Sequence, residues 1–280
     1  MPELPEVETI ARGLDKRVRG DVIESIWLGR HPEPLKSPAR EISSVLSGSR
    51  IRMVRRVGKH IVFDLEANGI SKKRSSSPHS QRQWIVHLGM TGRMLVTAPD
   101  DPIEKHTHAI ASLNSGRELR FVDPRRFGRL SVVVEEKGFS GPGTEPLTIT
   151  VEEFAHLFRG RKTPIKAALL NQKLLHGVGN IYTDESLFRA GIRPRRQASR
   201  LTRMELERLH RGLREVLHEA IKLGGSSVSD YVDAEGREGF FQLQHRVYLR
   251  TGKPCLVCAT RIKRIMVGGR GTHYCPRCQH

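Results

Sequence analysis

The sequence has no apolar run of the length that a membrane-spanning helix needs, and aromatic side chains make up only 5% of its residues. Its start, MPELPEVET, is acidic and contains proline, unlike a secretory signal peptide. No basic amphipathic helix with an aromatic face stands out, which disfavours binding to a membrane surface. These absences predict a cytosolic protein.

Acidic residues are also scarce relative to basic ones. Lys and Arg number 48 against 30 Asp and Glu, a formal charge of +18. Such a charge favours a polyanionic partner, most simply nucleic acid, although a merely basic protein remains the alternative. With 280 residues and 37% apolar content, the chain is long enough for two domains with a sizeable core.

Cysteine is absent until the last 26 residues, where two C-x2-C pairs follow each other with sixteen residues between them. This spacing is typical of a closed tetrahedral zinc site, and disulfides are the weaker interpretation in a cytosolic protein. A closed site has a structural role, so we expect catalysis elsewhere. The predicted zinc ligands are Cys255, Cys258, Cys275 and Cys278.

The segment between the cysteine pairs, TRIKRIMVGGRGTHY, predicts two short strands around a GGRG turn. Arg270 would then lie at the tip of a ribbon. It is either an ordinary solvated turn residue or, in a basic protein, a contact to phosphate.

The chain changes character along its length. Short β-like runs between about residues 22 and 134 predict a β-sandwich, and segments with helical periodicity fill residues 151–223. The serine-rich, basic stretch 69–83 is expected to be a mobile loop. The predicted divisions are an N-terminal domain 1–135, a linker 136–150, a helical domain 151–240 and a zinc finger 241–280.

The N-terminal stretch predicts a helix that begins near Pro5, since apolar residues recur on one face as far as Val18. One interpretation is that PELPE is only a well-capped helix start. The other is chemical: if Met1 is removed, Pro2 becomes a secondary amine, and an α-amino group has a pKa of about 8. Such an amine can attack an aldehyde-like carbon and form an iminium.

Two loops have both a structural and a functional interpretation. HGVGNIYTDE predicts a glycine-rich turn before a helix, which either binds an anion near Asn180 or simply uses Gly177 and Gly179 to turn tightly. In DPRRFG and HLGMTG, the side chains of Arg125, Phe127 and Met90 are either ordinary surface and packing residues or functional ones.

Taken together and in this order, PELPEVET, HLGMTG, KHTH, DPRRFG, GVGNIYTDESLFRAG and GRGTHYCPRC resemble the bacterial formamidopyrimidine-DNA glycosylases over nearly the whole chain. The resemblance implies an α+β multidomain fold, in which an N-terminal β-sandwich is joined to a helical domain with a helix-two-turns-helix motif and a C-terminal β-hairpin zinc finger. It implies a DNA glycosylase and abasic-site lyase that removes oxidised purines.

The resemblance also implies catalytic roles. Pro2 matches the family's nucleophile, and Glu3 matches the acid that protonates the sugar oxygen. Lys59 and Arg270 match the acids for β- and δ-elimination, and Glu6 matches a glutamate that orients the site.

Further matches concern DNA. Met90, Arg125 and Phe127 match the residues that fill the void left by a flipped nucleotide. Phosphate contacts match His106, Lys162, Asn180 and Arg270. Residues 226–241 resemble a flexible loop that covers the flipped base, whereas the 69–83 insertion is unusual for the family.

The expected partners are duplex DNA with oxidised purine or abasic sites and one structural zinc ion, with no organic cofactor and a monomeric state. Two rival hypotheses remain. The related endonuclease VIII branch prefers oxidised pyrimidines, although PELPEVET and DPRRFG favour the purine branch. A zinc-stabilised DNA-binding protein without catalysis would keep the charge and the finger but leave Pro2 and Glu3 unexplained.

Overall fold

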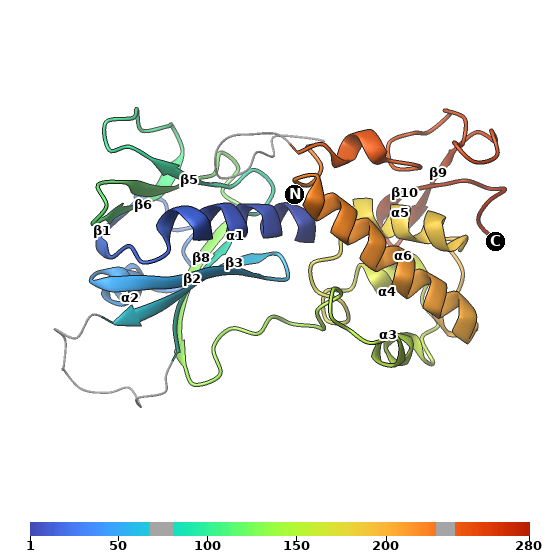
Figure 1. Ribbon diagram of the computed structural model, residues 1–280, viewed down its shortest axis with the longest axis horizontal. Coiled ribbons are helices and arrows are strands. Elements are labelled where there is room, and N and C mark those ends of the chain that lie inside the picture. Colours follow the sequence, from blue (N-terminus) through green and yellow to red (C-terminus); the bar gives the residue numbers. More distant parts are fainter. Residues whose placement is uncertain (68–80, 228–238) are drawn as a thin grey trace. The chain divides into compact units, whose positions relative to one another are not determined.

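The computed structural model describes residues 1–67, 81–227 and 239–280 and divides into two compact units (Figure 1). Unit 1 comprises Met1–Ser140 with Ser226–Gly239, and unit 2 comprises Gly141–Gly225 with Phe240–His280. The predicted loop at 69–80 and residues 228–238 of the predicted covering loop lie outside the described residues. No helix in the described ranges combines the length and the apolar character needed to cross a bilayer.

Unit 1 is built on two four-stranded antiparallel sheets, with strand orders β1-β6-β7-β5 and β2-β3-β4-β8. The strands of the first sheet are β1 (Ile23–Leu28), β5 (Arg93–Thr97), β6 (Thr107–Leu113) and β7 (Glu118–Val122). Those of the second are β2 (Ser49–Val57), β3 (His60–Ala67), β4 (Gln81–His87) and β8 (Arg129–Glu135).

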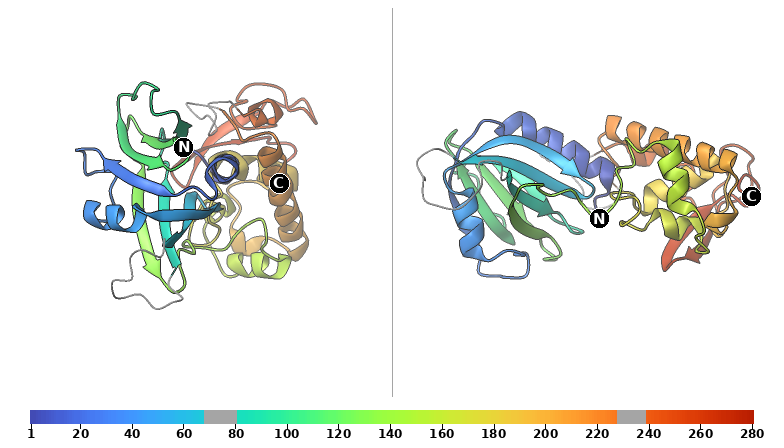
Figure 2. Two further views of the ribbon diagram at one scale, coloured as in Figure 1. Left: turned by 60° about the vertical axis from the view of Figure 1, so that its left-hand side comes forward. Right: turned by 90° about the horizontal axis from the view of Figure 1, so that it is seen from below.

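Apolar side chains of both sheets share one buried cluster, to which two helices contribute. Helix α1 (Leu4–Val18) lies alongside the sheets and contacts β2, β3 and β5, whereas α2 (Ala39–Leu46) packs on β1, β4 and β8 (Figure 2). The residues that α1 buries include the predicted apolar face from Val7 to Val18. The core thus holds the N-terminal end of the chain against the sandwich.

Unit 2 combines helices with a two-stranded ribbon. Helix α6 packs against α3 and α5, and α5 contacts the ribbon strand β10. The α-helices are α3 (Val151–Phe158), α4 (Ile165–Leu169), α5 (Asn180–Ala190) and α6 (Arg203–Lys222), with short 3-10 turns η1 (Ala198–Arg200) and η2 (Phe241–Gln244). The ribbon pairs β9 (Lys263–Val267) with β10 (Arg270–Tyr274).

The structure corrects several boundaries that the sequence predicts. Residues 81–83 belong to β4 and not to the preceding loop, because they pair with β3 and β8 and the Gln83 amide is buried. The helical periodicity of TPIKAALLNQKL predicts a helix over residues 163–174, but α4 ends at Leu169, since Asn171 Oδ1 accepts the Lys173 N–H and turns the chain.

Candidate functional site

The N-terminal end of α1 buries the candidate nucleophile and its neighbours. Pro2, Glu3 and Glu6 are buried, whereas Met1 is 46% exposed. The Glu6 carboxylate accepts the N–H groups of Glu3 and Ser226, each at 2.8 Å. Glu6 therefore fixes the backbone at Glu3 and ties it to the start of the 226–241 segment within unit 1. Helix α1 begins at Leu4, so Pro5 occupies the second position and not the first.

Lys59 lies in the tight turn that joins β2 to β3, where Val57 pairs with His60 and Gly58 has a positive φ of 61°. The imidazole rings of His60 and His87 lie 4.9 Å apart. Burial, reinforced by the positive charges of His60, Lys59 and Arg129, lowers the pKa of His87 to about 4.

A neutral His87 has a hydrogen-bonding role that the sequence did not suggest. Its Nδ1 accepts the Gly89 N–H at 3.1 Å, at the start of the loop that carries Met90. His87 thus connects the neighbourhood of Lys59 with the Met90 loop.

One buried carboxylate, Asp123, joins the HLGMTG and DPRRFG loops. Its Oδ1 accepts the Thr91 hydroxyl at 2.6 Å and the Arg125 N–H at 3.3 Å, and its Oδ2 accepts the Gly128 N–H at 2.7 Å. The two loops also touch through their backbones, because a Cβ on Gly89 would lie 2.6 Å from Gly128 N. The sequence analysis did not single out Asp123. The one feature that could have indicated it is its position directly after the apolar β7 run, as the first residue of DPRRFG.

These loops present the three predicted void-filling residues together. Met90 is 41% and Phe127 52% exposed, and Cζ of Arg125 lies 4.8 Å from the centre of the Phe127 ring. An exposed methionine and an exposed phenylalanine on loops held by buried hydrogen bonds are poor candidates for core packing. The arrangement can present two apolar side chains and a guanidinium to a partner.

His106 is attached to the same loops. It is half-buried in a left-handed conformation with φ of 74°, and its carbonyl oxygen accepts the Asp123 N–H at 3.0 Å. His108 Nε2 lies 2.9 Å from the Asp123 carbonyl oxygen. The KHTH and DPRRFG stretches therefore form one hydrogen-bonded group.

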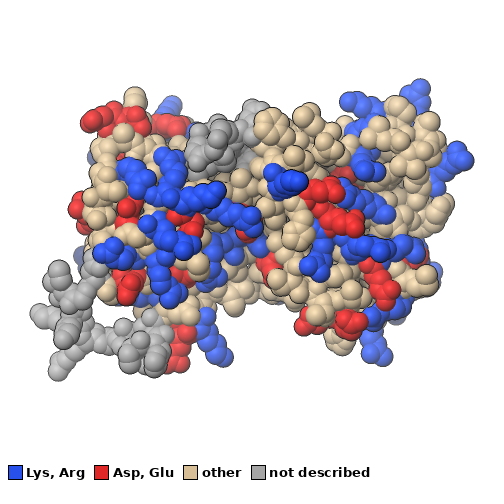
Figure 3. Space-filling view, viewed as in Figure 1, with Lys and Arg blue, Asp and Glu red and all other residues tan. Residues whose placement is uncertain are grey.

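Lys and Arg side chains gather over α1 and β2 on the face of unit 1 seen in Figure 3. Basic residues of these two elements also form ion pairs: Arg12 and Arg56 share the single carboxylate of Glu8, and Arg19, directly after α1, pairs with Asp15.

In unit 2, the GVGN turn is a tight, hydrogen-bonded connection into α5. Gln172 accepts the Gly177 N–H at 3.0 Å and donates to the Val178 carbonyl at 2.8 Å, while Gly177 has φ of 92°. Asn180 is the first residue of α5, and its Nδ2 donates to the Gly271 carbonyl of the ribbon at 3.0 Å. Lys162 is exposed before α4.

His176, a bulky residue before this turn, is buried, and its Nε2 lies 3.5 Å from Glu145 Oε2. Its backbone N–H donates to the Thr144 carbonyl at 3.2 Å. The residue therefore anchors the first segment of unit 2 to the turn.

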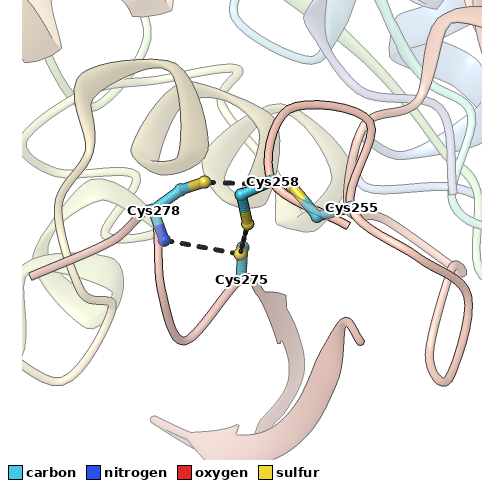
Figure 4. Close-up of side chains that lie close together, drawn as sticks. All are labelled: Cys255, Cys258, Cys275 and Cys278. Atoms are coloured by element: carbon cyan, nitrogen blue, oxygen red, sulfur yellow. Dashed lines mark hydrogen bonds between the residues drawn. The ribbon is translucent and has the colours of Figure 1, made fainter. Parts of the chain in front are cut away.

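The four cysteines converge on one point (Figure 4). All four Sγ atoms lie within 4.8 Å of one another, with 3.5 Å between those of Cys258 and Cys275 and 3.9 Å between those of Cys255 and Cys278. Four thiolates around a zinc ion lie about 3.8 Å apart, given Zn–S bonds of about 2.3 Å. The donor set thus fits a tetrahedral zinc ion, and none of the four forms a disulfide.

The ribbon confirms the predicted turn. Gly268 and Gly269 connect β9 to β10 with φ of 57° and 73°, and Arg270 is exposed directly after them. Within unit 2, Asn180 lies close to Arg270, because its side chain donates to the carbonyl of Gly271, the residue after Arg270 in β10. Among the described residues, no hydrogen bond links Lys162 to them.

Three family models match the chain. Residues 1–130 match the formamidopyrimidine-DNA glycosylase N-terminal domain, residues 141–232 its H2TH domain, and residues 252–280 a zinc finger found in FPG and IleRS. The last match covers all four cysteines, so the chain carries one structural zinc ion.

Curated relatives match this chain over its full length. Formamidopyrimidine-DNA glycosylase of Solibacter usitatus is 44% identical over 284 residues, covering 100% of this chain and 99% of the relative. That of Bacillus subtilis is 40% identical over 291 residues, covering 100% and 99%.

Among solved structures, an FPG variant from Lactococcus lactis bound to Fapy-dG-containing DNA superimposes with a TM-score of 0.88, at 34% identity and 100% coverage of both chains. MutM (FPG) from Thermus thermophilus gives 0.84 at 41% identity, covering 99% of this chain and 98% of that one. The predicted fold class is therefore confirmed, and the chain belongs to the formamidopyrimidine-DNA glycosylase family.

Proposed function

We propose that this chain is a bifunctional DNA glycosylase and abasic-site lyase of base excision repair, which removes oxidised purines such as 8-oxoguanine and formamidopyrimidines. The observation that carries the proposal is the buried Pro2 at the N-terminal end of α1, followed by the buried carboxyl groups of Glu3 and Glu6. Solved relatives support the substrate class, since they hold DNA with Fapy-dG, abasic sites or carbocyclic 8-oxo-G.

Base removal begins once Met1 has been cleaved off, because only then is the Pro2 nitrogen an amine. This nitrogen attacks C1′ of the flipped nucleotide, and the glycosidic bond between C1′ and the base breaks. The Pro2 nitrogen loses its proton, and the base leaves after gaining one. Glu3 protonates the sugar ring oxygen, the ring opens, and an iminium forms between Pro2 and C1′. Glu6 keeps the Glu3 backbone in place through its hydrogen bond to the Glu3 N–H.

Strand cleavage uses the iminium as an electron sink. Loss of a C2′ proton expels the 3′ phosphate, and loss of a C4′ proton then expels the 5′ phosphate. Lys59 serves as the acid in β-elimination and Arg270 in δ-elimination. No organic cofactor enters these steps, and the zinc ion stays structural because its four thiolate ligands leave no open position.

DNA binding needs side chains that replace the flipped nucleotide and others that hold the backbone. Met90 and Phe127 act as apolar wedges, and the Arg125 guanidinium hydrogen-bonds the orphaned cytosine. His106, Lys162 and Asn180 contact phosphates, so affinity falls steeply as salt rises. Residues 226–241 cover the everted base.

The protein acts as a monomer in the bacterial cytoplasm. Its domains are the N-terminal domain 1–135, a linker 136–150, the helical domain 151–240 and the zinc finger 241–280.

Borohydride trapping tests the chemistry directly, because borohydride reduces an iminium to a stable amine. We expect a covalent adduct with a duplex that carries 8-oxoguanine opposite cytosine, located on Pro2 by mass spectrometry, with Met1 absent. The Pro2→Gly variant should still bind this duplex but cleave it much more slowly.

A zinc-loaded protein that binds the duplex but gives no adduct would support the non-catalytic DNA-binding hypothesis. Adducts only with oxidised pyrimidines would support the endonuclease VIII alternative. This arm is needed because a solved Lactococcus lactis FPG complex contains DNA with an oxidised pyrimidine.

A further inference from the structure

A fully buried ion pair lies behind the ribbon of unit 2. Lys166 on α4 and Asp184 on α5 are both fully buried, with 2.6 Å between Nζ and Oδ1. Two charges removed from water are tolerated only when further hydrogen bonds satisfy the remaining donors and acceptors of both groups. The partners that satisfy them therefore show what the pair is built to hold.

Those partners belong to β10, the strand that begins with Arg270. Lys166 Nζ donates to the Gly271 carbonyl at 3.1 Å, and Asp184 Oδ2 accepts the His273 N–H at 2.8 Å and lies 3.2 Å from its ring Nδ1. Asn180 adds a second hydrogen bond to the Gly271 carbonyl at 3.0 Å. The pair thus grips the strand on both sides of Thr272, which is itself fully buried.

The turn at the end of the ribbon rests on the same helix. A Cβ on Gly268 would lie 3.1 Å from the Cβ of Ala167, the residue after Lys166. Arg270 pairs with Val267 across the ribbon while its side chain is exposed. Its backbone is therefore held from the turn side and from the Gly271 side, whereas its guanidinium remains accessible.

The zinc site cannot hold the backbone at Arg270, because it lies at the other end of the ribbon. Cys275 follows β10 directly, so the metal fixes the base of the ribbon near Tyr274. A two-stranded ribbon is marginal alone in water, so its tip needs a separate support. The Lys166–Asp184 pair supplies it.

We propose that Asp184 is a positioning residue for Arg270: together with Lys166 it fixes the backbone that aims the guanidinium during δ-elimination. The inference rests on the proposed function of Arg270. Small displacements of a catalytic group can cost on the order of 100-fold in rate, so a loosened tip should impair the step that uses Arg270 more than the steps that use Pro2.

The test compares Asp184→Asn, Arg270→Ala and their combination on a duplex with a preformed abasic site. We expect Asp184→Asn to lower the ratio of δ- to β-elimination product about tenfold. In the Arg270→Ala background the same substitution should lower this ratio little further, because Asp184 acts through Arg270 and the two effects are then not additive. Hydrogen exchange in peptides spanning 268–274 should be faster, with zinc content unchanged.

Glu219→Gln is the matched control. It removes a carboxylate charge in the same unit, from a pair with Arg189 on the surface, and should change neither the ratio nor the exchange. If Asp184→Asn does not fold, the double variant Lys166→Met with Asp184→Leu replaces the pair by apolar side chains of similar size, which buried pairs often tolerate. It should give the same two changes.

A folded, zinc-loaded Asp184 variant with the wild-type product ratio would overturn the inference, provided that Arg270→Ala lowers that ratio. If Arg270→Ala leaves the ratio unchanged, the proposed role of Arg270 fails instead. Faster ribbon exchange in Asp184→Asn would then still support the anchoring of the ribbon.

Discussion

The two units hold their candidate functional residues by different physical means. In unit 1, the loops with Lys59, Met90 and Phe127 join strands whose side chains form one large apolar cluster. Among the described residues of unit 2, the finger contributes Val247, Cys255, Ile262 and Cys275 to a small apolar cluster that Phe188 of α5 completes. The ribbon that carries Arg270 therefore depends on a metal ion and on a buried ion pair.

The difference follows from size. A sandwich of eight strands buries enough apolar surface to fix its loops, and a single carboxylate such as Asp123 then suffices to join two of them. A finger of about 40 residues buries too little apolar surface, so stronger directional interactions must replace it. Function in unit 1 should thus be sensitive to core packing, and function in unit 2 to charge and metal.

Zinc removal should give the largest effect and should separate the two units. Structural zinc contributes about 10–16 kcal/mol in finger peptides, so a chelator or Cys275→Ser should abolish hydrogen-exchange protection of β9 and β10. Strands β2 to β4 should keep theirs, because no cysteine lies in unit 1. Equal loss of protection in both units would contradict the comparison.

A cavity in the sandwich should have the reverse effect. Trp84 is fully buried and stacks on Phe63 with ring centres 4.8 Å apart. Trp84→Ala should lower the free energy of unfolding of unit 1 by about 3–5 kcal/mol while exchange in unit 2 stays unchanged. Trp27→Ala, at a side chain 51% exposed on β1, is the control and should cost much less.

Acidification should give a smaller effect, to which His87 contributes at the Lys59 end of unit 1 and the buried His245, whose pKa is also lowered to about 4, contributes in unit 2. The pKa of His87 is about 4 in the folded protein against an ordinary 6.5, mainly because the ring is buried. Between these values the unfolded state binds more protons, so the free energy of unfolding falls as pH drops from 6.5 to 4, by at most about 3 kcal/mol.

Thermal unfolding of unit 1 across this pH range measures the effect. His87→Gln, which retains an acceptor for the Gly89 N–H, should make the dependence shallower. The same change at exposed His156 in unit 2 should leave it intact, and an unchanged slope in His87→Gln would assign the pH dependence to other groups.

The sequence predicted those elements whose own residues show a clear periodicity, turn motif or spacing. The apolar face of α1, the ribbon around GGRG and the convergence of four cysteines are of this kind. Two elements of unit 1 were missed: α2, a single short helix among strands, and β6, which begins within the polar KHTH stretch and lacks clear alternation. The end of α4 was also missed, because the Asn171 side chain competes with the helix for a backbone N–H.

The sequence by itself determined the zinc ligands, which depend on residue type at fixed spacing, and the ordered motifs from which the family resemblance and, through it, the candidate catalytic residues follow. Only the tertiary structure decided which polar side chains lose their water and must find partners. Asp123 joins two loops, and Asp184 meets Lys166 and His273 across 18 and 89 positions of the chain. Burial makes an unpaired charge costly, and the fold alone determines which charges are buried and which groups meet them.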